Sequence, residues 1–200
     1  MKDLNTYITE KLKIRKTSYK YFPETKEELQ DLLKQLIKER GNEGNFNDID
    51  TSEITDMSEL FAGMIKFNGD ISNWDMSNVT NMGHMFYYCL SFNQDISNWD
   101  VSNVTNMYGM FEFCNLFNQD ISNWNVSNVT DMGYMFYGCK SFNQPLAKWN
   151  VSKVTNMSGI FFKCESFNQD ISNWDVFNVK YYRGIFQFCT IKEKYKPKFD

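Results

Sequence analysis

The cysteines are the residues with the greatest potential for chemistry, and they recur at a fixed spacing. All five lie 25 residues apart, at Cys89, Cys114, Cys139, Cys164 and Cys189. Thiolates bind zinc, but the paired CxxC spacing of such sites is absent and the chain has one histidine. We therefore expect a buried structural column and no metal site. Repeats stacked about 4.8 Å apart would bring neighbouring thiols within the range of a disulfide, so spacing alone does not separate them.

Carboxylates form two further columns with the same period. Their members are Asp70, Asp95, Asp120 and Asp170, interrupted by Pro145, and Asp75, Asp100 and Asp175, with Asn125 and Asn150 between them. Stacked carboxylates repel one another, and calcium would relieve this through oxygen coordination. The glycine-rich pattern of calcium-binding β-rolls is absent, however. We expect these side chains to hold turns by accepting hydrogen bonds from backbone amides, with calcium as the open alternative.

His84 is the single histidine, and its column holds glycine or tyrosine in the other repeats. A catalytic histidine needs a nucleophile or an orienting carboxylate nearby, and the adjacent columns offer mostly tyrosine and glycine. We expect a surface histidine. No phosphate loop or metal motif is present, so the sequence predicts no catalytic residue, no cofactor site and no enzyme.

The rest of the chain repeats with the period of the cysteines. Tryptophans follow it at Trp74, Trp99, Trp124, Trp149 and Trp174, and valine and phenylalanine columns keep the same phase. A fixed period with an apolar skeleton is typical of a solenoid, whose units bury their faces against their neighbours. Within a unit we expect a short strand over DISNWD, a turn at Ser-Asn, an extended or 3₁₀ piece at Val-Thr-Asn-Met, and one helical turn at about Met107 to Cys114.

A separate pattern precedes the repeats. Thr25 and Glu28 form a capping box, an apolar stripe of Leu and Ile follows at helical spacing, and Gly41 ends it, which predicts a helix at about 26–40. We divide the chain into an arm and capping helix at 1–45, six repeats at 46–189, and a basic tail at 190–200. The first repeat is degenerate, as terminal repeats of solenoids are. Residues 1–20 are interpreted as a short strand or an ordered arm.

Composition limits the function. Aromatic residues make up 17% of the chain, and the net charge is -4. Residues 46–189 carry seven Lys and Arg against fifteen Asp and Glu, an acidic balance that argues against nucleic acid as a partner. Neither a signal peptide nor an apolar run long enough to span a membrane is visible. We expect a cytoplasmic protein without membrane insertion, and a secreted or cell-surface location is the alternative.

The repeat V-T-N-M-x-x-M-F-x-x-C-x-x-F-N-x-D-I-x-x-W-D-V-S-N, as at 104–128 with Asn125 in place of Asp, resembles the BspA-like leucine-rich repeat family. It is most similar to the branch called DUF285, or the surface protein 26-residue repeat type. This resemblance implies a solenoid of leucine-rich-repeat type, α+β or mainly β, with short parallel strands and one helical turn in each of about six repeats. It also implies a role in protein binding.

Recognition would be encoded where the repeats differ. The variable positions after the conserved Met and Phe of each unit carry Tyr87, Tyr88, Tyr108, Glu112, Phe113, Tyr134, Tyr137, Phe162 and Phe188. Aromatic residues are enriched at protein interfaces, although these could equally pack sideways onto neighbouring repeats. We expect a non-catalytic module that binds a protein partner of unknown identity. Alternatives are a bacterial surface adhesin-like protein or a viral or phage inhibitor of a host protein, and the C-terminal end could join a second copy.

Overall fold

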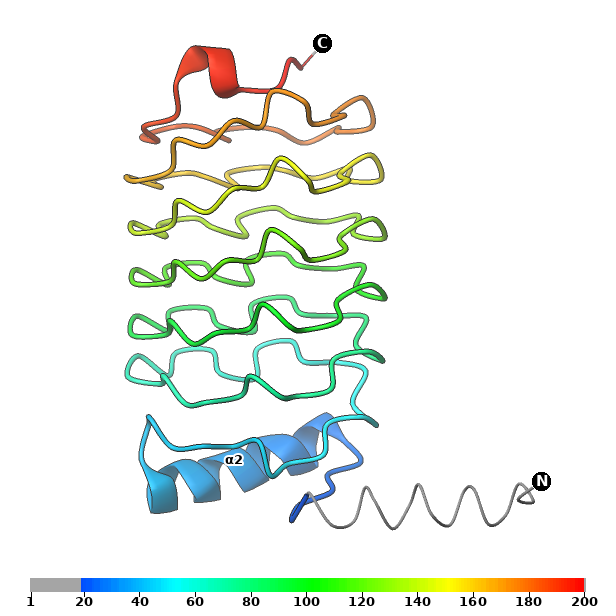
Figure 1. Cartoon of the computed structure of the whole chain (residues 1–200), viewed down its shortest axis with the longest axis vertical. Coiled ribbons are helices and arrows are strands. Elements are labelled where there is room, and N and C mark those ends of the chain that lie inside the picture. The colour runs from blue at the N-terminus through cyan, green and yellow to red at the C-terminus, as the bar shows by residue number, and fades with distance from the viewer. Residues whose placement is uncertain (1–18, 200) are drawn as a thin grey trace, which may run out of the picture.

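The chain winds into a stack of flat coils, each 25 residues long, as the computed structural model shows for residues 19–199 (Figure 1). Five parallel bridges join six successive coils at Asp56, Asn81, Asn106, Asp131, Asn156 and Tyr181. Helix α2 (Lys26–Arg40) lies at one end of the stack, and the 3₁₀ helix η1 (Glu193–Tyr195) lies at the other. Most of the predicted N-terminal arm falls outside the described residues.

The predicted fold class is wrong. Sequence patterns and family resemblance led us to expect a strand-rich solenoid of leucine-rich-repeat type, α+β or mainly β. Among residues 19–199, the parallel pairing consists of isolated bridges, and the repeats contain neither strands nor helical turns. The coils are built from tight turns joined by hydrogen bonds to the coils above and below.

A turn replaces the expected strand over DISNWD, and a second turn follows it directly. The Trp99 amide donates to the Ile96 carbonyl over 3.2 Å, and the Val104 amide donates to the Val101 carbonyl over 3.0 Å. Each turn reverses the chain, so apolar residues spaced three, two and three positions apart all point inward. All four side chains are buried. A strand would instead place every second residue on one face.

The expected helical turn at Met107 to Cys114 is also absent. The amides of Met107, Gly109, Phe111 and Phe113 donate to carbonyls of the next coil over 2.7–2.9 Å. Gly109 and Phe113 have φ angles of 59° and 60°, in the left-handed region. An α-helix needs these amides for its own i→i−4 bonds. Since the next coil accepts them, the segment folds into short i→i−3 turns.

Parallel aromatic rings fill the centre of the stack. The Phe86 and Phe111 rings are 5.6 Å apart and 1° from parallel, and Phe111 and Phe117 of one coil are 4.0 Å apart. The tryptophans add a polar contact, because each indole Nε1–H donates to the carbonyl 28 residues earlier. The five distances lie between 3.0 and 3.2 Å, for Trp74, Trp99, Trp124, Trp149 and Trp174. The tryptophan column therefore fixes the register between coils as well as filling the core.

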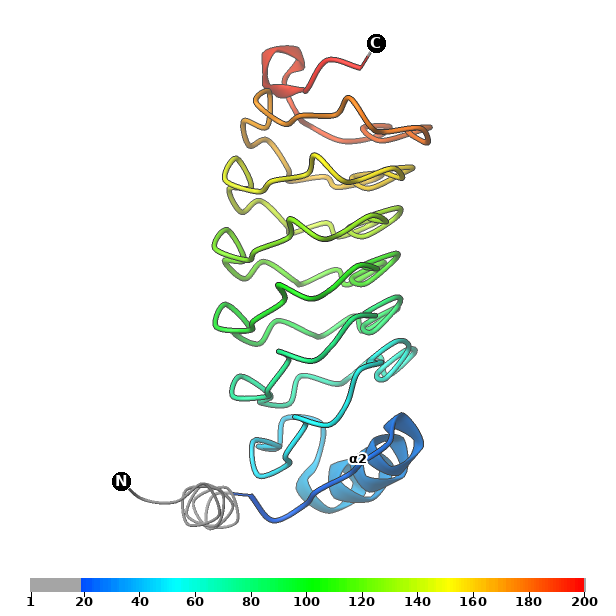
Figure 2. The ribbon, with the colours of Figure 1, turned by 90° about the vertical axis from the view of Figure 1, so that its right-hand side faces the viewer.

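Helix α2 covers the N-terminal end of the core (Figure 2). The Thr25 side chain accepts a hydrogen bond from the Glu28 amide over 3.2 Å, which starts the helix. Gly41 ends it with a φ of 80°, while its amide donates to the Ile37 carbonyl. One face of the helix is fully buried, at Leu29, Leu33 and Leu36. The observed bounds agree with the range predicted from the capping box.

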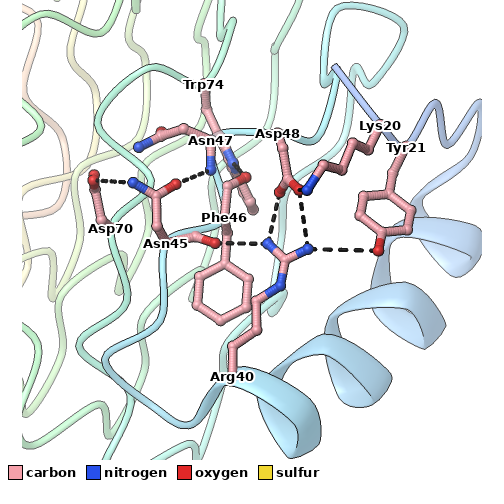
Figure 3. Close-up of polar contacts among 9 residues, drawn as sticks. All are labelled: Lys20, Tyr21, Arg40, Asn45, Phe46, Asn47, Asp48, Asp70 and Trp74. Carbon is pink, nitrogen blue, oxygen red and sulfur yellow. Dashed lines mark hydrogen bonds and ion pairs between the residues drawn. The ribbon is translucent and has the colours of Figure 1, made fainter. Parts of the chain in front are cut away.

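Arg40 joins the last turn of α2 to the first coil (Figure 3). Its guanidinium donates to both carboxylate oxygens of Asp48 over 2.7 and 3.0 Å, and to the Asn45 carbonyl over 2.7 Å. The same hydrogen bond from Arg40 lowers the pKa of Asp48. Arg40 also donates to the Tyr21 hydroxyl over 3.5 Å. The Lys20 amide donates to the Asp48 carbonyl, which joins the segment before α2 to the same coil. Planar pairing of this kind fixes orientation as well as position.

The C-terminal segment crosses the opposite end of the stack (Figure 1). Ile191 and Pro197 are buried, and the Ile171 amide donates to the Tyr195 carbonyl over 3.0 Å. The Phe199 ring lies 5.2 Å from that of Tyr182. The composition of the basic tail at 190–200 predicts an end-cap strand or a disordered segment, but residues 190–199 pack onto the last coil and contain a 3₁₀ helix and no strand.

Replacing Trp124 with Phe tests the tryptophan column. The variant keeps an aromatic ring but loses the donor to the Ile96 carbonyl, so we expect the free energy of unfolding to fall by about 1–3 kcal/mol in urea titration. Asn98→Ala, at an exposed position of the adjacent coil, should change it by less than about 0.5 kcal/mol. Equal stability of Trp124→Phe and the unaltered chain would contradict a register role for the indole N–H.

Candidate functional site

The predicted partner-binding residues lie along one edge of the stack, which we call the aromatic edge. It consists of Tyr87, Tyr88, Tyr108, Glu112, Phe113, Tyr134, Tyr137, Phe162, Phe188 and, in addition, His84. The segment equivalent to 107–113 of each coil carries these residues, and hydrogen bonds to the next coil hold that segment in place. The structure therefore brings all nine predicted residues together.

Ring contacts link the edge from coil to coil. The Tyr88 and Phe113 rings are 4.7 Å apart, and the Phe113 and Tyr137 rings are 5.0 Å apart. Tyr137 stacks on Phe162 at 4.6 Å and 1° from parallel, and Phe162 meets Phe188 at 5.4 Å. Aromatic pairs of this kind contribute about 0.5–1.5 kcal/mol each beyond the area they bury. The edge is thus a connected surface rather than a set of isolated side chains.

Several of these aromatic residues occupy left-handed backbone positions. Tyr88, Phe113, Tyr134 and Phe188 have φ angles between 57° and 60°. Other coils place glycine in the same two columns, at Gly63, Gly109, Gly138, Gly159 and Gly184. A residue with a Cβ costs about 1–2 kcal/mol in this conformation, whereas glycine does not. The large side chains are therefore held against a local backbone preference.

Packing onto glycine accounts for some of these side chains. A Cβ added to Gly138 would lie 2.8 Å from the Phe113 ring, and one added to Gly159 would lie 2.9 Å from the Tyr134 ring. A Cβ added to Gly133 would lie 3.1 Å from the Tyr108 ring, although the Asn156 side chain would be closer, at 2.6 Å. These three rings fill space that the next coil leaves open. Some aromatic side chains of the edge therefore pack onto the neighbouring coil, which is the alternative considered from the sequence, and others remain exposed.

Tyr88 and Phe188 are the most accessible parts of the edge. Their exposed fractions are 40% and 65%, while the other seven predicted residues are half-buried. Neither ring covers a glycine: the coil after that of Tyr88 has Phe113 in the same column, and Phe188 belongs to the last coil among residues 19–199. These two residues combine exposure with an unfavourable backbone conformation.

Glu112 and His84 form a polar pair within the aromatic edge. His84 Nδ1 lies 3.6 Å from Glu112 Oε2, at ion-pair distance, and has no hydrogen-bond partner among the described residues. Burial raises the pKa of Glu112 to about 7. A hollow of about 360 Å³ opens beside the pair, lined by Glu59, Ala62, His84, Tyr87 and Glu112. Its lining includes two carboxyl groups, one imidazole and one phenol, but no serine, threonine or cysteine.

His84 was missed as a member of this edge. The sequence predicts a surface histidine, but its ring meets Tyr87 at 5.4 Å and Tyr108 at 5.1 Å. A Cβ added to Gly109 of the next coil would clash with the same ring. The available signal was the alternation of large residues with glycine in this column, which indicates that a side chain of one coil covers the gap in the next.

The aspartate columns hold turns, as predicted. Asp95, Asp120 and Asp170 each accept a hydrogen bond from the amide two residues later over 2.9–3.0 Å. Asn125 and Asn150 do the same in the second column. Hydrogen bonds from Ser97 and Ser122 lower the pKa values of Asp95 and Asp120. Within residues 19–199, no group of three or more possible ligands is placed to hold a metal ion.

The five cysteines of the repeat column form no disulfide, and four of them are buried. Four thiols donate to the carbonyl 28 residues earlier over 2.9 Å, from Cys89, Cys114, Cys139 and Cys164. Cys189 makes a longer contact with the Phe167 carbonyl at 3.6 Å. Burial raises the pKa of Cys89 to about 12 and that of its neighbours as well. Since thiolates are the reactive form, these cysteines are poor nucleophiles.

Comparison with known protein families agrees with the repeat pattern. The family described as "Mycoplasma protein of unknown function, DUF285" matches residues 29–140 and 116–196. The chain belongs to this family. The search of curated proteins and the search of solved structures found no match. The DUF285 match begins at Leu29 within α2 and extends over the coils, and the family description assigns no activity. Among residues 19–199, no helix is long and apolar enough to cross a membrane.

Glu112→Gln tests the buried carboxyl of this DUF285 chain. The folded-state pKa of about 7 exceeds the usual 4.5, so the folded state binds more protons than the unfolded state between these values. Stability of the unaltered chain should therefore fall by about 1–3 kcal/mol as pH rises from 4.5 to 8. Denaturant titrations at several pH values should show that the free energy of unfolding of the variant depends much less on pH. Glu53→Gln, at an exposed position, should keep the pH dependence of the unaltered chain, and an unchanged pH dependence in Glu112→Gln would show that the carboxyl ionises freely.

Substitutions at Asp120 separate turn formation from calcium binding. Asp120→Ala removes the acceptor for the Ser122 amide and should lower the free energy of unfolding by about 1 kcal/mol. Asp120→Asn should cost less, because Asn125 and Asn150 hold equivalent turns. Thermal melts in calcium and in a chelator should coincide. If calcium raised the melting temperature of the unaltered chain but not that of Asp120→Asn, the result would support the calcium alternative.

Proposed function

We propose that this chain is a non-catalytic module that binds a protein partner through the aromatic edge. The observation that carries the proposal is the pair Tyr88 and Phe188, which expose large rings from left-handed backbone positions. Glycine would suit the backbone better at both positions, and no neighbouring glycine requires their rings. Unfavourable conformations of this kind concentrate at functional sites.

The shape and composition of the edge suit a protein partner. Tyrosine and phenylalanine bury a large area at a low entropic cost, and they are enriched at the centres of protein interfaces. The connected rings extend over five coils from His84 to Phe188, which is long enough to engage an extended surface. Arginine is a suitable partner side chain, because it can stack on these rings and pair with Glu112.

A catalytic role has less support. His84 and Glu112 are the acid–base pair of the edge, but no serine, threonine or cysteine lines their hollow, whose hydroxyl is the weakly nucleophilic phenol of Tyr87. The five cysteines are unpaired, and the four innermost are buried. An acidic body also disfavours nucleic acid as the partner. We place the protein in the cytoplasm in this proposal, since stacked free thiols are most readily kept reduced there.

Paired substitutions test the edge. Affinity purification from the native host should recover a partner with the unaltered chain and lose at least about 90% of it with Tyr87→Ala combined with Tyr137→Ala, by loss of central aromatic contacts. The combination Asn98→Ala with Asn123→Ala alters exposed residues of the turns beside the tryptophans and should retain the partner. Circular dichroism should show that both double variants stay folded.

A second variant distinguishes the exposed rings from the packed ones. Tyr88→Gly should weaken binding while keeping or raising stability, because glycine favours the φ of 59° at this position. Full retention of the partner by both Tyr88→Gly and the double tyrosine variant would exclude the aromatic edge as the binding site.

A further inference from the structure

The coils present backbone donors in one direction. The amides of Met157, Gly159, Phe161 and Lys163 donate to the carbonyls of Tyr181, Arg183, Ile185 and Gln187 over 2.7–3.1 Å. The same pattern joins every earlier pair of coils along this segment, so alternate amides always point toward the C-terminal end. A row of donors must therefore remain wherever the stack stops.

That row lies on the last coil. By their place in the repeat, the amides of Tyr182, Gly184, Phe186 and Phe188 correspond to donors of the earlier coils. Within the described part of the chain they have no hydrogen-bond acceptor. The carbonyls between them accept from the preceding coil, and those of Gly184 and Phe186 accept from the amides of Gln187 and Cys189. We call the four amides without an acceptor the terminal amide row.

A groove runs beside the terminal amide row. Its volume is about 1080 Å³, and it separates Tyr182, Gly184 and Phe186 from the C-terminal segment at 193–199, with Trp174 also lining it. The C-terminal segment crosses the end of the stack without pairing with the row (Figure 1). The amides therefore face a space large enough for another chain segment.

Three lysines and one glutamate line this groove, at Lys194, Lys196, Lys198 and Glu193, and Arg183 lies in the sequence between the lining residues Tyr182 and Gly184. Lys180, Arg183, Lys194 and Lys198 form no salt bridge among residues 19–199, while Lys196 pairs with Glu193 over 2.6 Å. Exposed rings lie nearby, with Phe177 at 84%, Tyr181 at 64% and Tyr182 at 46% exposure. The end of the stack is thus basic and aromatic, in contrast to the acidic body.

We propose that the terminal amide row and its lysines bind an acidic segment of a partner protein, with Asp or Glu carboxylates seated on the amides. A carboxylate only accepts hydrogen bonds, which suits a row that only donates. The edge of an ordinary β-strand alternates N–H donors with C=O acceptors. If such a strand lay along the row, some of its N–H groups would face the N–H groups of the row, and neither could accept a hydrogen bond. Successive backbone N–H groups form anion-binding concavities elsewhere in proteins, and nearby lysines strengthen the attraction.

This surface is separate from the aromatic edge, except that Phe188 belongs to both. The acidic-segment proposal does not depend on the proposed function, because it rests on basic charge and unpaired amides and not on the exposed rings. If the Tyr87 and Tyr137 substitutions had no effect on partner binding, the acidic-segment proposal would still stand.

Fluorescence anisotropy with a designed peptide tests the site. The probe is a fluorescein-labelled octapeptide of alternating Glu and Thr, which places carboxylates on every second residue, as the amides are placed. The full chain should bind it at least ten-fold more tightly than the matched peptide with Gln in place of Glu. Binding should weaken as salt is raised. Equal binding of the two peptides, or no binding of either, would overturn the proposal.

Variants locate the binding. Arg183→Gln with Lys194→Gln and Lys198→Gln should weaken the acidic peptide at least ten-fold, while Lys34→Gln with Lys38→Gln and Lys66→Gln, at exposed positions elsewhere, should change it less than two-fold. Tyr182→Pro and Tyr182→Ala both remove the ring, but only proline removes the amide. The proline variant should bind at least three-fold more weakly than the alanine variant, with both shown to be folded by thermal melts. Equal affinity of the proline and alanine variants for the acidic peptide would show that the Tyr182 amide does not bind a carboxylate.

A second copy of the chain is the competing occupant. Sedimentation measurements should show a monomer whose mass is unchanged by the three basic substitutions. A dimer that those substitutions dissociate, together with failure of the acidic peptide to bind, would assign the groove to self-association and overturn the proposal.

Discussion

Hydrogen bonds between residues about one period apart are the constraint on which the structure depends. Indole and thiol donors reach carbonyls 28 residues earlier, and Asn103 and Asn128 side chains reach carbonyls 26 residues earlier. An insertion of one residue in a coil would displace the contacts of that coil with both of its neighbours together. Buried donors and acceptors left without partners are costly, so the 25-residue spacing is maintained by the sum of many small terms.

The same constraint explains which parts of the fold could be predicted from sequence. The period, the buried Trp, Phe and Cys columns and the turn-forming aspartates follow from residue types that repeat in phase. Helix α2 followed from local signals at Thr25 and Gly41, which act within one turn of the chain. Met107, Met110, Phe111 and Cys114 have helical spacing, and that spacing was misleading. Local patterns do not reveal that a neighbouring coil accepts the amides that a helix would need.

The aromatic edge shows a similar division. Its members were found because they vary while the core columns do not. Their conformations were not predictable from residue type, since Tyr and Phe rarely adopt the left-handed region. Glycine at the same positions of other coils was the signal for that backbone, and it also marked where a ring from one coil covers the next. The paired burial of Glu112 and His84 depends on contacts between adjacent coils, which a single repeat does not contain.

The repetition of nearly identical coils has a consequence for the length of the molecule. Each inner coil makes nearly the same contacts above and below, so removing or duplicating 25 residues in the middle would preserve both ends and every column. Length can therefore change only in whole steps, and gene duplication within the repeat is a simple route to it. Such a change would move helix α2 and the basic terminus apart by a fixed increment without redesigning either one. The number of coils thus sets the separation between two dissimilar ends.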